Sequence, residues 1–358
     1  MDIEKMDPNL AAVSGNCEGV KFISAHDERI SLHGVYFDET EGIYRRVPEE
    51  VAKLSSEYMV ALGKMTAGGR IRFITDSPYI AIKASIPYFS IMSHMTITGS
   101  HGFSVYADGF FQNRYSPTPK AFAKTFAKGE KIYFADKKNL LKPEGKKLIE
   151  IYFPLYGGVS ELYIGVAPES IIEKAPDYAI TKPMVFYGSS LTQGACVSRP
   201  GNDYISIIGR RLNADYVNLG FSGNGNAEAN MVDFINSFDG SIYCFDYNLY
   251  ANFPDRVLPP HYSIYERIRE KHPTAGILLT DKPCCDYDKN IQREQTILDT
   301  YERAIANGDK NVALVPAIDL FGVGERDSCT VDGLHPNDLG AMRMADAFTP
   351  AIKKLLGI

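Results

Sequence analysis

The chain has 358 residues, 45% of them hydrophobic and 23% charged, with a formal net charge of -6, and this length suits two domains of ordinary size. Such mild acidity, without a basic stripe or tail, argues against nucleic acid or an anionic membrane as the main partner. No apolar run approaches the roughly 20 residues needed to span a bilayer, and the first residues lack the basic and then apolar profile of a signal peptide. As written, the chain is expected in the cytoplasm, whereas a trimmed precursor would allow a secreted or periplasmic protein.

The first half of the chain shows the alternation of short antiparallel strands. Apolar and polar residues alternate over 70–74 and 79–83, and clusters of turn-forming residues separate these runs. This spacing is typical of a β-sandwich, and the alternation ends near residues 171–183. We therefore expect residues 1–180 to form an antiparallel, jelly-roll-like β-sandwich domain with a substrate-binding or accessory role.

The second half alternates apolar strands with longer helical patterns. Five runs are predicted to be strands, at 184–187, 216–219, 242–246, 276–280 and 312–317. Strands that alternate with helices form a parallel sheet covered on both faces. Residues 181–358 are therefore expected to form a flavodoxin-like, three-layer α/β/α domain. Its site should lie at the carboxyl ends of the strands, where the winding reverses.

A serine follows the first of these strands. Ser190 lies in the turn Gly188-Ser189-Ser190-Leu191, between the strand and a helical pattern over 203–212. A serine hydroxyl is a poor nucleophile at neutral pH and needs a nearby general base, while backbone NH groups at a helix start can stabilise the oxyanion that forms. The turn thus predicts a nucleophile and one oxyanion donor, and the base must come from elsewhere.

His335 is the best candidate for that base. Asp332 precedes it by three residues, Gly333 allows a tight bend between them, and Pro336 suits the first turn of a following helix. The carboxylate would fix the tautomer of the imidazole, and the ring would take the serine proton and later protonate the leaving alcohol. Either motif alone is often just a turn or a capped helix start, whereas together they predict a catalytic triad in the order Ser, Asp, His.

These motifs resemble those of the SGNH hydrolases, also called GDSL-type esterases and acylhydrolases. The turn 188–191 resembles the Gly-Asp-Ser-Leu block with serine in place of aspartate, and Asp332 and His335 match the last block. The run 194–201 is similar to a branch of the family whose members carry an amino-terminal β-domain. The resemblance implies an ester hydrolase whose catalytic domain is the second half of the chain.

The resemblance also implies an oxyanion hole made by Ser190, Gly223 and an asparagine. Gly223 lies in the run 218–225, which resembles the second block, whose glycine donates a backbone NH. The third block departs from the pattern, because Tyr250 occupies the position of the expected asparagine, with Asn248 and Asn252 on either side. We take Asn252 as the candidate, although any one of the three could donate.

Metal and cofactor motifs are not evident. The six cysteines have neither disulfide-framework nor zinc-ligand spacing. Residues 286–290 open like a calcium loop, but Ile291 and Ile297 stand where glycine and the bidentate glutamate are required. We predict no metal and no cofactor.

The branch with the amino-terminal β-domain resembles carbohydrate esterases. The first hypothesis is therefore removal of acetyl or other small acyl groups from sugars, with an oligosaccharide or small-molecule ester as substrate. Aromatic residues of the first domain could stack on a sugar: Tyr36, Phe37, Tyr44, Phe110 and Phe111. One alternative is a short-chain carboxylesterase or lysophospholipase-like acylhydrolase. Another is a carbohydrate-binding protein with an impaired hydrolase half. This alternative is motivated by the tyrosine at position 250, where the oxyanion-hole asparagine is expected.

Overall fold

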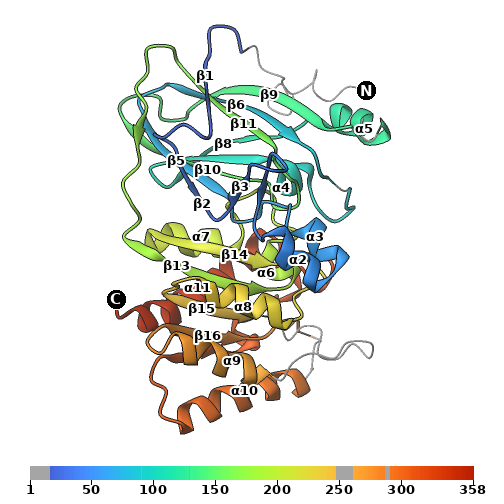
Figure 1. Ribbon diagram of the computed structural model, residues 1–358, viewed down its shortest axis with the longest axis vertical. Helices are drawn as coiled ribbons and strands as arrows, with labels where there is room; N and C mark the ends of the chain where they lie inside the picture. The colour runs from blue at the N-terminus through green and yellow to red at the C-terminus, as the bar shows by residue number, and fades with distance from the viewer. Residues whose placement is uncertain (1–16, 90, 129, 247–260, 287–290) are drawn as a thin grey trace. The chain divides into compact units, whose positions relative to one another are not determined.

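The computed structural model describes residues 17–89, 91–128, 130–246, 261–286 and 291–358 (Figure 1). The chain divides into two compact units. The sandwich unit comprises Met1–Arg45 and Lys64–Pro176, and the α/β unit comprises Arg46–Gly63 and Asp177–Ile358. Within the described residues, no helix combines the length and the apolarity needed to cross a membrane.

The sandwich unit contains two antiparallel sheets, as the strand alternation predicts. One has the order β1-β11-β6-β9, with the bounds Lys21–Ser24, Glu161–Val166, Tyr79–Ile86 and Ile132–Asn139. The other has the order β12-β5-β10-β7-β8, with the bounds Glu173–Lys174, Arg70–Thr75, Lys147–Tyr152, Phe103–Ala107 and Phe110–Tyr115. The remaining elements of this unit are β2 (Ser31–His33), which pairs with β5, the hairpin of β3 (Tyr36–Asp38) and β4 (Ile43–Arg45), and the helices α4 (Ile97–His101) and α5 (Pro119–Lys128).

Alternate side chains of both sheets meet in one hydrophobic core. Ile80 and Ile82 of β6 and Ile149 and Ile151 of β10 are fully buried in the same cluster, while Lys83 of β6 is exposed. Side chains on successive strand positions point to opposite faces, so this alternation fixes the register of a sandwich. The predicted antiparallel sandwich is confirmed.

The α/β unit is built on five parallel strands in the order β14-β13-β15-β16-β17. Their bounds are Ala214–Gly220, Ile180–Gly188, Ile242–Asp246, Gly276–Thr280 and Val312–Val315. All five predicted strands are present, and the last is shorter than expected. It ends before Pro316, which has no NH for a ladder bond, and a 3₁₀ turn, η2 (Ala317–Asp319), follows.

Helices cover both faces of this sheet, which confirms the three-layer arrangement. On one face α7 (Tyr204–Leu212) packs against α11 (Asp338–Leu356), and on the other α8 (Ala229–Ser237), α9 (His261–Lys271) and α10 (Ile291–Ala306) pack in succession (Figure 1). The winding reverses at β13, so the crevice for a ligand is expected at the carboxyl ends of β13 and its neighbours. Two short helical turns, α6 (Ser190–Gln193) and η3 (Asp327–Cys329), lie in the loops.

Residues 46–63 interrupt the sandwich unit in sequence but belong to the α/β unit. They form α2 (Glu49–Ser55) and α3 (Glu57–Leu62), and Ser56 caps α3 by accepting a hydrogen bond from the NH of Met59 at 3.1 Å. Asn230 of α8 donates to the carbonyl of Val51 at 2.8 Å and to Oγ of Ser55 at 2.7 Å. These contacts tie α2 to α8, so the chain divides at residues 45, 63 and 176, whereas the sequence pattern suggests a single boundary near 180.

Candidate active site

Ser190 is the first residue of α6, directly after β13. Ser189 caps this turn, because its Oγ accepts the NH of Leu191 at 3.2 Å. A Cβ on Gly188 would lie 2.3 Å from Oγ1 of Thr192 and 2.6 Å from the carbonyl oxygen of Asp246, so only glycine fits there. The resulting sharp turn from strand to helix places Ser190 at the carboxyl edge of the sheet, as the sequence predicts.

The imidazole of His335 lies against Ser190. Ser190 Oγ and His335 Nε2 are 2.9 Å apart, although the two residues are separated by 145 positions in sequence. Ser190 follows β13, whereas His335 lies in the loop between η3 and α11. The fold therefore brings together the proposed nucleophile and base within hydrogen-bond reach.

Asp332 completes the chain of hydrogen bonds. Its Oδ2 lies 2.7 Å from His335 Nδ1, and its Oδ1 accepts the backbone NH groups of His335 at 2.8 Å and Leu334 at 3.1 Å. Burial raises the pKa of this carboxyl, but the hydrogen bonds and the charge of His335, with the NH of Leu334, outweigh burial and lower the pKa overall. An ionised Asp332 favours a proton on Nδ1, which leaves Nε2 able to accept the serine proton.

The loop that carries this pair is held independently of the triad. Gly333 adopts φ +85°, its NH donates to Oγ1 of Thr330 at 3.0 Å, and the thiol of Cys285 donates to its carbonyl at 3.2 Å. The side chain of Asn337 caps α11 by accepting the NH groups of Leu339 and Gly340. These contacts hold the loop that carries Asp332 and His335.

The loop between β14 and α8 packs on the nucleophile turn. The NH of Phe221 donates to the carbonyl of Gly188 at 2.9 Å, and a Cβ on Gly225 would lie 2.4 Å from the same carbonyl oxygen. Gly223 lies between these two contacts with φ +72°, and a Cβ there would meet no atom within 4 Å. Gly223 thus lies in a loop that packs on the nucleophile turn, as its expected role as an oxyanion donor requires.

The third expected donor lies outside the described residues. Asn248, Tyr250 and Asn252 all fall in 247–260, so the choice among them stays a prediction. The strand that leads to them ends at Asp246, which pairs with Gly188 across the sheet. The end of β15 at Asp246 therefore lies beside the end of β13, which leads into the nucleophile turn.

Residues without a role in the sequence analysis also support the turn. Asn218 donates to the carbonyl of Thr192 at 2.8 Å, and Gln193 Oε1 accepts the NH of Ser222 at 2.9 Å. Their signal in sequence is their place in or close to these blocks: Asn218 opens the second block, and Gln193 lies two residues after the first. Arg46 contacts the same loop from a distant segment, and nothing local in the sequence marks it.

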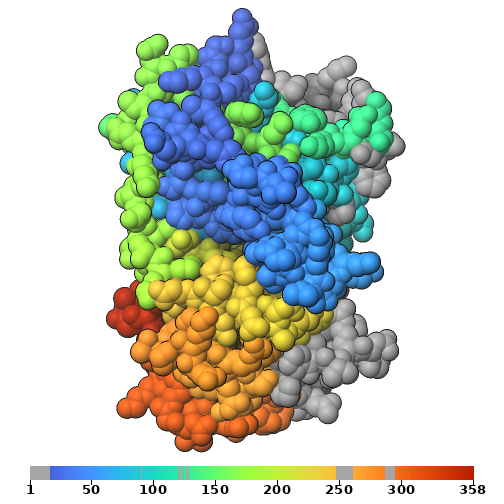
Figure 2. Space-filling view, in the orientation of Figure 1, coloured from blue at the N-terminus to red at the C-terminus, as the bar shows by residue number. Residues whose placement is uncertain are grey.

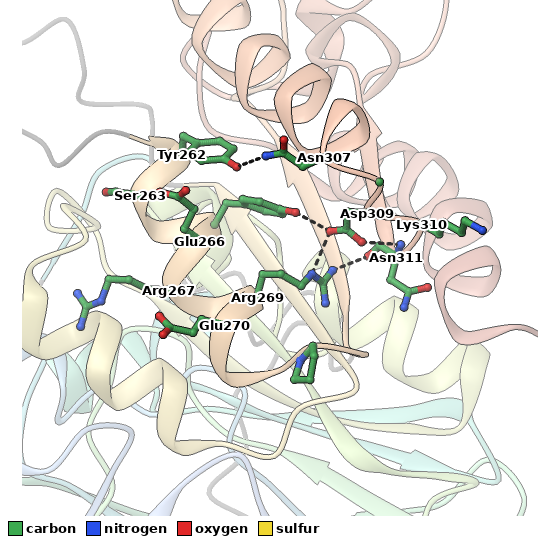
Figure 3. A pocket seen from close by; sticks show the side chains of 13 residues that line it. Tyr262, Ser263, Glu266, Arg267, Arg269, Glu270, Asn307, Asp309, Lys310 and Asn311 are labelled. Atoms are coloured by element: carbon green, nitrogen blue, oxygen red, sulfur yellow. Dashed lines mark hydrogen bonds and ion pairs between the residues drawn. The ribbon is translucent and has the colours of Figure 1, made fainter.

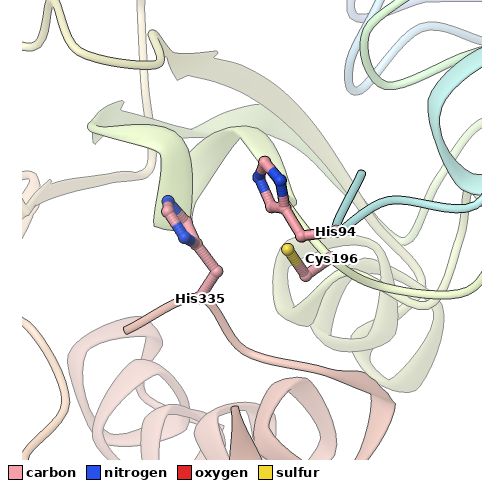
Figure 4. A group of neighbouring side chains, drawn as sticks. All are labelled: His94, Cys196 and His335. Carbon is pink, nitrogen blue, oxygen red and sulfur yellow. The ribbon is translucent and has the colours of Figure 1, made fainter. Parts of the chain in front are cut away.

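Cys196 is a further neighbour of the base (Figure 4). Its Sγ lies within 4.8 Å of a ring nitrogen of His335, and its backbone adopts φ +70°. Burial and then the negative charge of Asp332 raise the pKa of this thiol to about 12, so it stays protonated and does not compete as a nucleophile. Since both nitrogens of His335 already bond to Ser190 and Asp332, we propose no metal ion here.

A surface hollow of the α/β unit lies away from these residues. Its volume is about 900 Å³, and it is lined by α9 and the residues before β17 (Figure 3). Asp309 in this hollow binds Arg269 at 2.9 Å and the hydroxyl of Tyr265 at 2.7 Å. The hollow lies at the amino ends of β16 and β17, whereas Ser190 follows the carboxyl end of β13, so it is not the site of the triad.

Two family profiles match the two halves of the chain. Residues 181–353 match the GDSL-like Lipase/Acylhydrolase family, and residues 20–172 match the amino-terminal domain of SGNH-hydrolase-type esterases. No curated protein sequence matches the chain.

Solved structures share the fold over nearly the whole chain. A protein described as a GDSL-like lipase from Bacteroides ovatus is 26% identical, with a TM-score of 0.77, and the match covers 95% of this chain and 98% of that one. The salicylyl-acyltransferase SsfX3 from a tetracycline biosynthetic pathway is 19% identical, with a TM-score of 0.74 and the same coverage. A family two carbohydrate esterase from Clostridium thermocellum is 14% identical, with a TM-score of 0.63 over 92% of this chain and 99% of that one. The last two likenesses show the fold alone.

Proposed function

Because the chain belongs to the SGNH (GDSL-type) hydrolase family and is an ester hydrolase, we propose that it removes acetyl or other small acyl groups from sugars through Ser190, His335 and Asp332. The observation that carries the esterase chemistry is the unbroken chain of hydrogen bonds from Ser190 Oγ through both ring nitrogens of His335 to Asp332, at 2.9 and 2.7 Å. It argues against the alternative of a binding protein with a decayed hydrolase half.

The proposed reaction has two steps. Ser190 Oγ attacks the ester carbonyl carbon while His335 Nε2 takes the hydroxyl proton, and the carbonyl oxygen becomes an oxyanion stabilised by backbone NH groups. When this tetrahedral intermediate collapses, the bond between the carbonyl carbon and the alcohol oxygen breaks. The alcohol leaves with the proton from His335, and the acyl group remains on Ser190. Water then attacks this acyl-enzyme with His335 again as base, which releases the acid and restores Ser190.

The sugar substrate is supported by likeness of fold and by exposed aromatic side chains. The Clostridium thermocellum esterase was solved with cellohexaose, and its fold matches both units of this chain. Of the five aromatic residues proposed for stacking, Phe110 is 72% exposed and Tyr36 is 38% exposed, whereas Tyr44 is fully buried in the sandwich core. Phe110 and Tyr36 thus remain the candidates for contact with a sugar.

A substrate panel tests the acyl acceptor and the chain length together. We expect higher kcat/KM on acetylated xylo-oligosaccharides than on p-nitrophenyl acetate, and falling activity on p-nitrophenyl esters as the acyl chain lengthens. A preference for longer acyl chains would instead support the carboxylesterase or lysophospholipase-like alternative. Ser190→Ala should be inactive on every ester; full activity of this variant would contradict the esterase assignment itself.

A further inference from the structure

We propose that Arg46, in the segment that interrupts the sandwich unit, is a positioning residue for the oxyanion hole of the hydrolase. It would do so by holding the end of β14 and the loop that follows, on which Gly223 lies. The inference rests on the proposed function, since it concerns the same reaction. It assigns a role in turnover to residues 46–63, which the catalytic motifs do not include.

The guanidinium of Arg46 binds the backbone at the end of β14. Nη1 donates to the carbonyl of Gly220 at 2.6 Å and to that of Asn218 at 3.2 Å, although these residues follow Arg46 by 174 and 172 positions. Nη2 donates to the carbonyl of Leu62, at the end of α3, at 2.9 Å. One planar group therefore joins the segment 46–63 to the strand that leads into the oxyanion loop.

Arg46 also packs on the first residue of that loop. Its guanidinium carbon lies 4.6 Å from the centroid of the Phe221 ring, and Arg46 is only 2% exposed. The stacking of a guanidinium on an aromatic face and its fork of donors are properties that lysine does not reproduce. The backbone NH of Phe221 also donates to the carbonyl of Gly188 at 2.9 Å, so the start of the oxyanion loop is held both by Arg46 and by the end of β13.

The same segment reaches the loop beyond Gly223. The hydroxyl of Ser56 donates to Oδ1 of Asn224 at 3.2 Å, and Asn224 in turn donates to the carbonyl of Ser222 at 3.2 Å. Gly223 is thus bracketed by Arg46, acting through Gly220 and Phe221, and by Ser56, acting through Asn224. In Figure 2 the blue atoms of α2 and α3 lie against the yellow atoms of α8, which begins just after this loop.

The contacts on both sides of Gly223 matter because an oxyanion donor stabilises the oxyanion only from a narrow range of positions. A donor must lie about 2.7–3.1 Å from the position that the oxyanion will occupy. Glycine has the greatest backbone freedom of all residues, so its NH direction depends on the residues that flank it. We infer that loss of Arg46 lets the NH of Gly223 drift from this position while Ser190, His335 and Asp332 stay paired.

The first test compares Arg46→Met, Arg46→Lys and Arg269→Met in the full chain with p-nitrophenyl acetate. Arg269 is a matched control, because it also donates to three backbone carbonyls, those of His272, Ala275 and Asn311, but at the amino edge of the sheet. We expect kcat to fall about 10- to 100-fold in Arg46→Met, within the range known for loss of one oxyanion donor. KM should change little, Arg46→Lys should recover part of the loss, and Arg269→Met should keep the wild-type kcat.

A second readout separates positioning from a purely structural role. In Arg46→Met the affinity for a boronic acid that forms a tetrahedral adduct on serine should fall in parallel with kcat/KM, because both depend on the oxyanion site. The pH profile of kcat/KM should keep its wild-type midpoint, because the triad is untouched. Equal effects of Arg46→Met and Arg269→Met on kcat at equal loss of thermal stability would overturn the proposal.

If Arg46→Met does not fold, Ser56→Asp provides an independent test of the proposal. Aspartate still caps α3 by accepting the NH of Met59, but it has no proton to give to Asn224. We expect a smaller fall in kcat than in Arg46→Met, with unchanged thermal stability. A kcat equal to that of wild type would count against the proposal that Arg46 and Ser56 together hold the loop around Gly223. If wild type shows no esterase activity, the proposed function fails; if wild type is active and these variants match it, only this inference fails.

Discussion

At the scale of single residues, the proposed triad depends on a carboxylate that is held by more than the imidazole. Asp332 accepts two backbone NH groups besides the imidazole, and these bonds lower its pKa below the usual aspartate range against the effect of burial. The carboxylate therefore stays ionised at neutral pH and holds the ring of His335. Ser190 receives a base whose tautomer is already set.

Asp332→Asn tests this role of the carboxylate. An amide placed there can donate to Nδ1 of His335, which favours the tautomer with its proton on Nε2, unable to accept the serine proton. We expect kcat to fall by about 10³- to 10⁴-fold. The control is Asp338→Asn, since the carboxylate of Asp338 accepts hydrogen bonds from the NH and the hydroxyl of Ser198 and takes no part in the triad, so turnover should stay nearly intact. An Asp332→Asn enzyme with the kcat of wild type would show that Asp332 has no role in the mechanism.

The pH dependence of kcat/KM follows from the same arrangement. Only a neutral imidazole can take the serine proton, and histidine is the side chain that ordinarily changes charge between pH 5 and 8. Since the lowered pKa of Asp332 keeps it ionised throughout that window, the rate should rise with pH in a single step. A flat rate over that range, measured with a soluble acetyl ester, would be inconsistent with His335 as base.

At the scale of elements, the site depends on how closely the β14–α8 loop approaches the turn after β13. Gly225 lies against the carbonyl of Gly188, and Gly220 lies against α6, where an added Cβ would be 2.1 Å from the NH nitrogen of Gln193. Neither glycine can be replaced without moving backbone. The two blocks that carry Ser190 and Gly223 are thus one packed unit.

Gly225→Ala should therefore impair turnover more than stability. Its Cβ would meet the carbonyl oxygen of Gly188 at 2.4 Å and push the loop off the nucleophile turn. We expect kcat to fall by about tenfold or more, as for a displaced oxyanion donor. Gly209→Ala, in α7, is the control, because its Cβ would meet the ring of Tyr216 of β14 at 2.6 Å. It should lower the melting temperature without a matching loss of kcat, and the reverse pattern would refute this account of the loop.

The strands of the α/β unit can be predicted from the sequence, because buried parallel strands read as short continuous apolar runs. Ser190 and His335 can be paired from the sequence as well, because each lies in a short motif at the start of a helix. The place of residues 46–63 in the α/β unit cannot be predicted in this way, since two short helices carry no local sign of their partner. The same holds for Arg46: an arginine is usually at the surface, and the burial of Arg46 depends on carbonyl groups more than 170 positions away.

At the scale of the whole molecule, each unit contains a buried histidine. Burial lowers the pKa of His101 in the sandwich unit to about 4 and that of His261 in the α/β unit to about 3. His261 Nδ1 lies 3.0 Å from Oγ1 of Thr300, whose hydroxyl donates to Thr296, so the ring is the donor in a neutral form. Both native units therefore reject protons that an unfolded chain accepts.

Acid should destabilise both units for this reason. Below about pH 6.5, the ordinary histidine value, the unfolded chain binds protons that the native rings do not, so stability falls progressively until about pH 4 for His101 and about pH 3 for His261. We expect His101→Asn and His261→Asn to lower the melting temperature at pH 7 but to weaken its dependence on pH between 7 and 4. His26→Asn, at an exposed position, serves as control. Variants that keep the full wild-type dependence on pH would show that these rings do not cause it.

The central claim is that Ser190 is a nucleophile activated by His335, and covalent labelling tests it most directly. A fluorophosphonate that reacts with activated serines should modify wild-type protein once, with the adduct mapped by peptide mass spectrometry to Ser190. His335→Ala should label far more slowly at unchanged fold, and Ser190→Ala should not label. A wild-type protein that hydrolyses esters while its adduct maps to another residue would contradict the account.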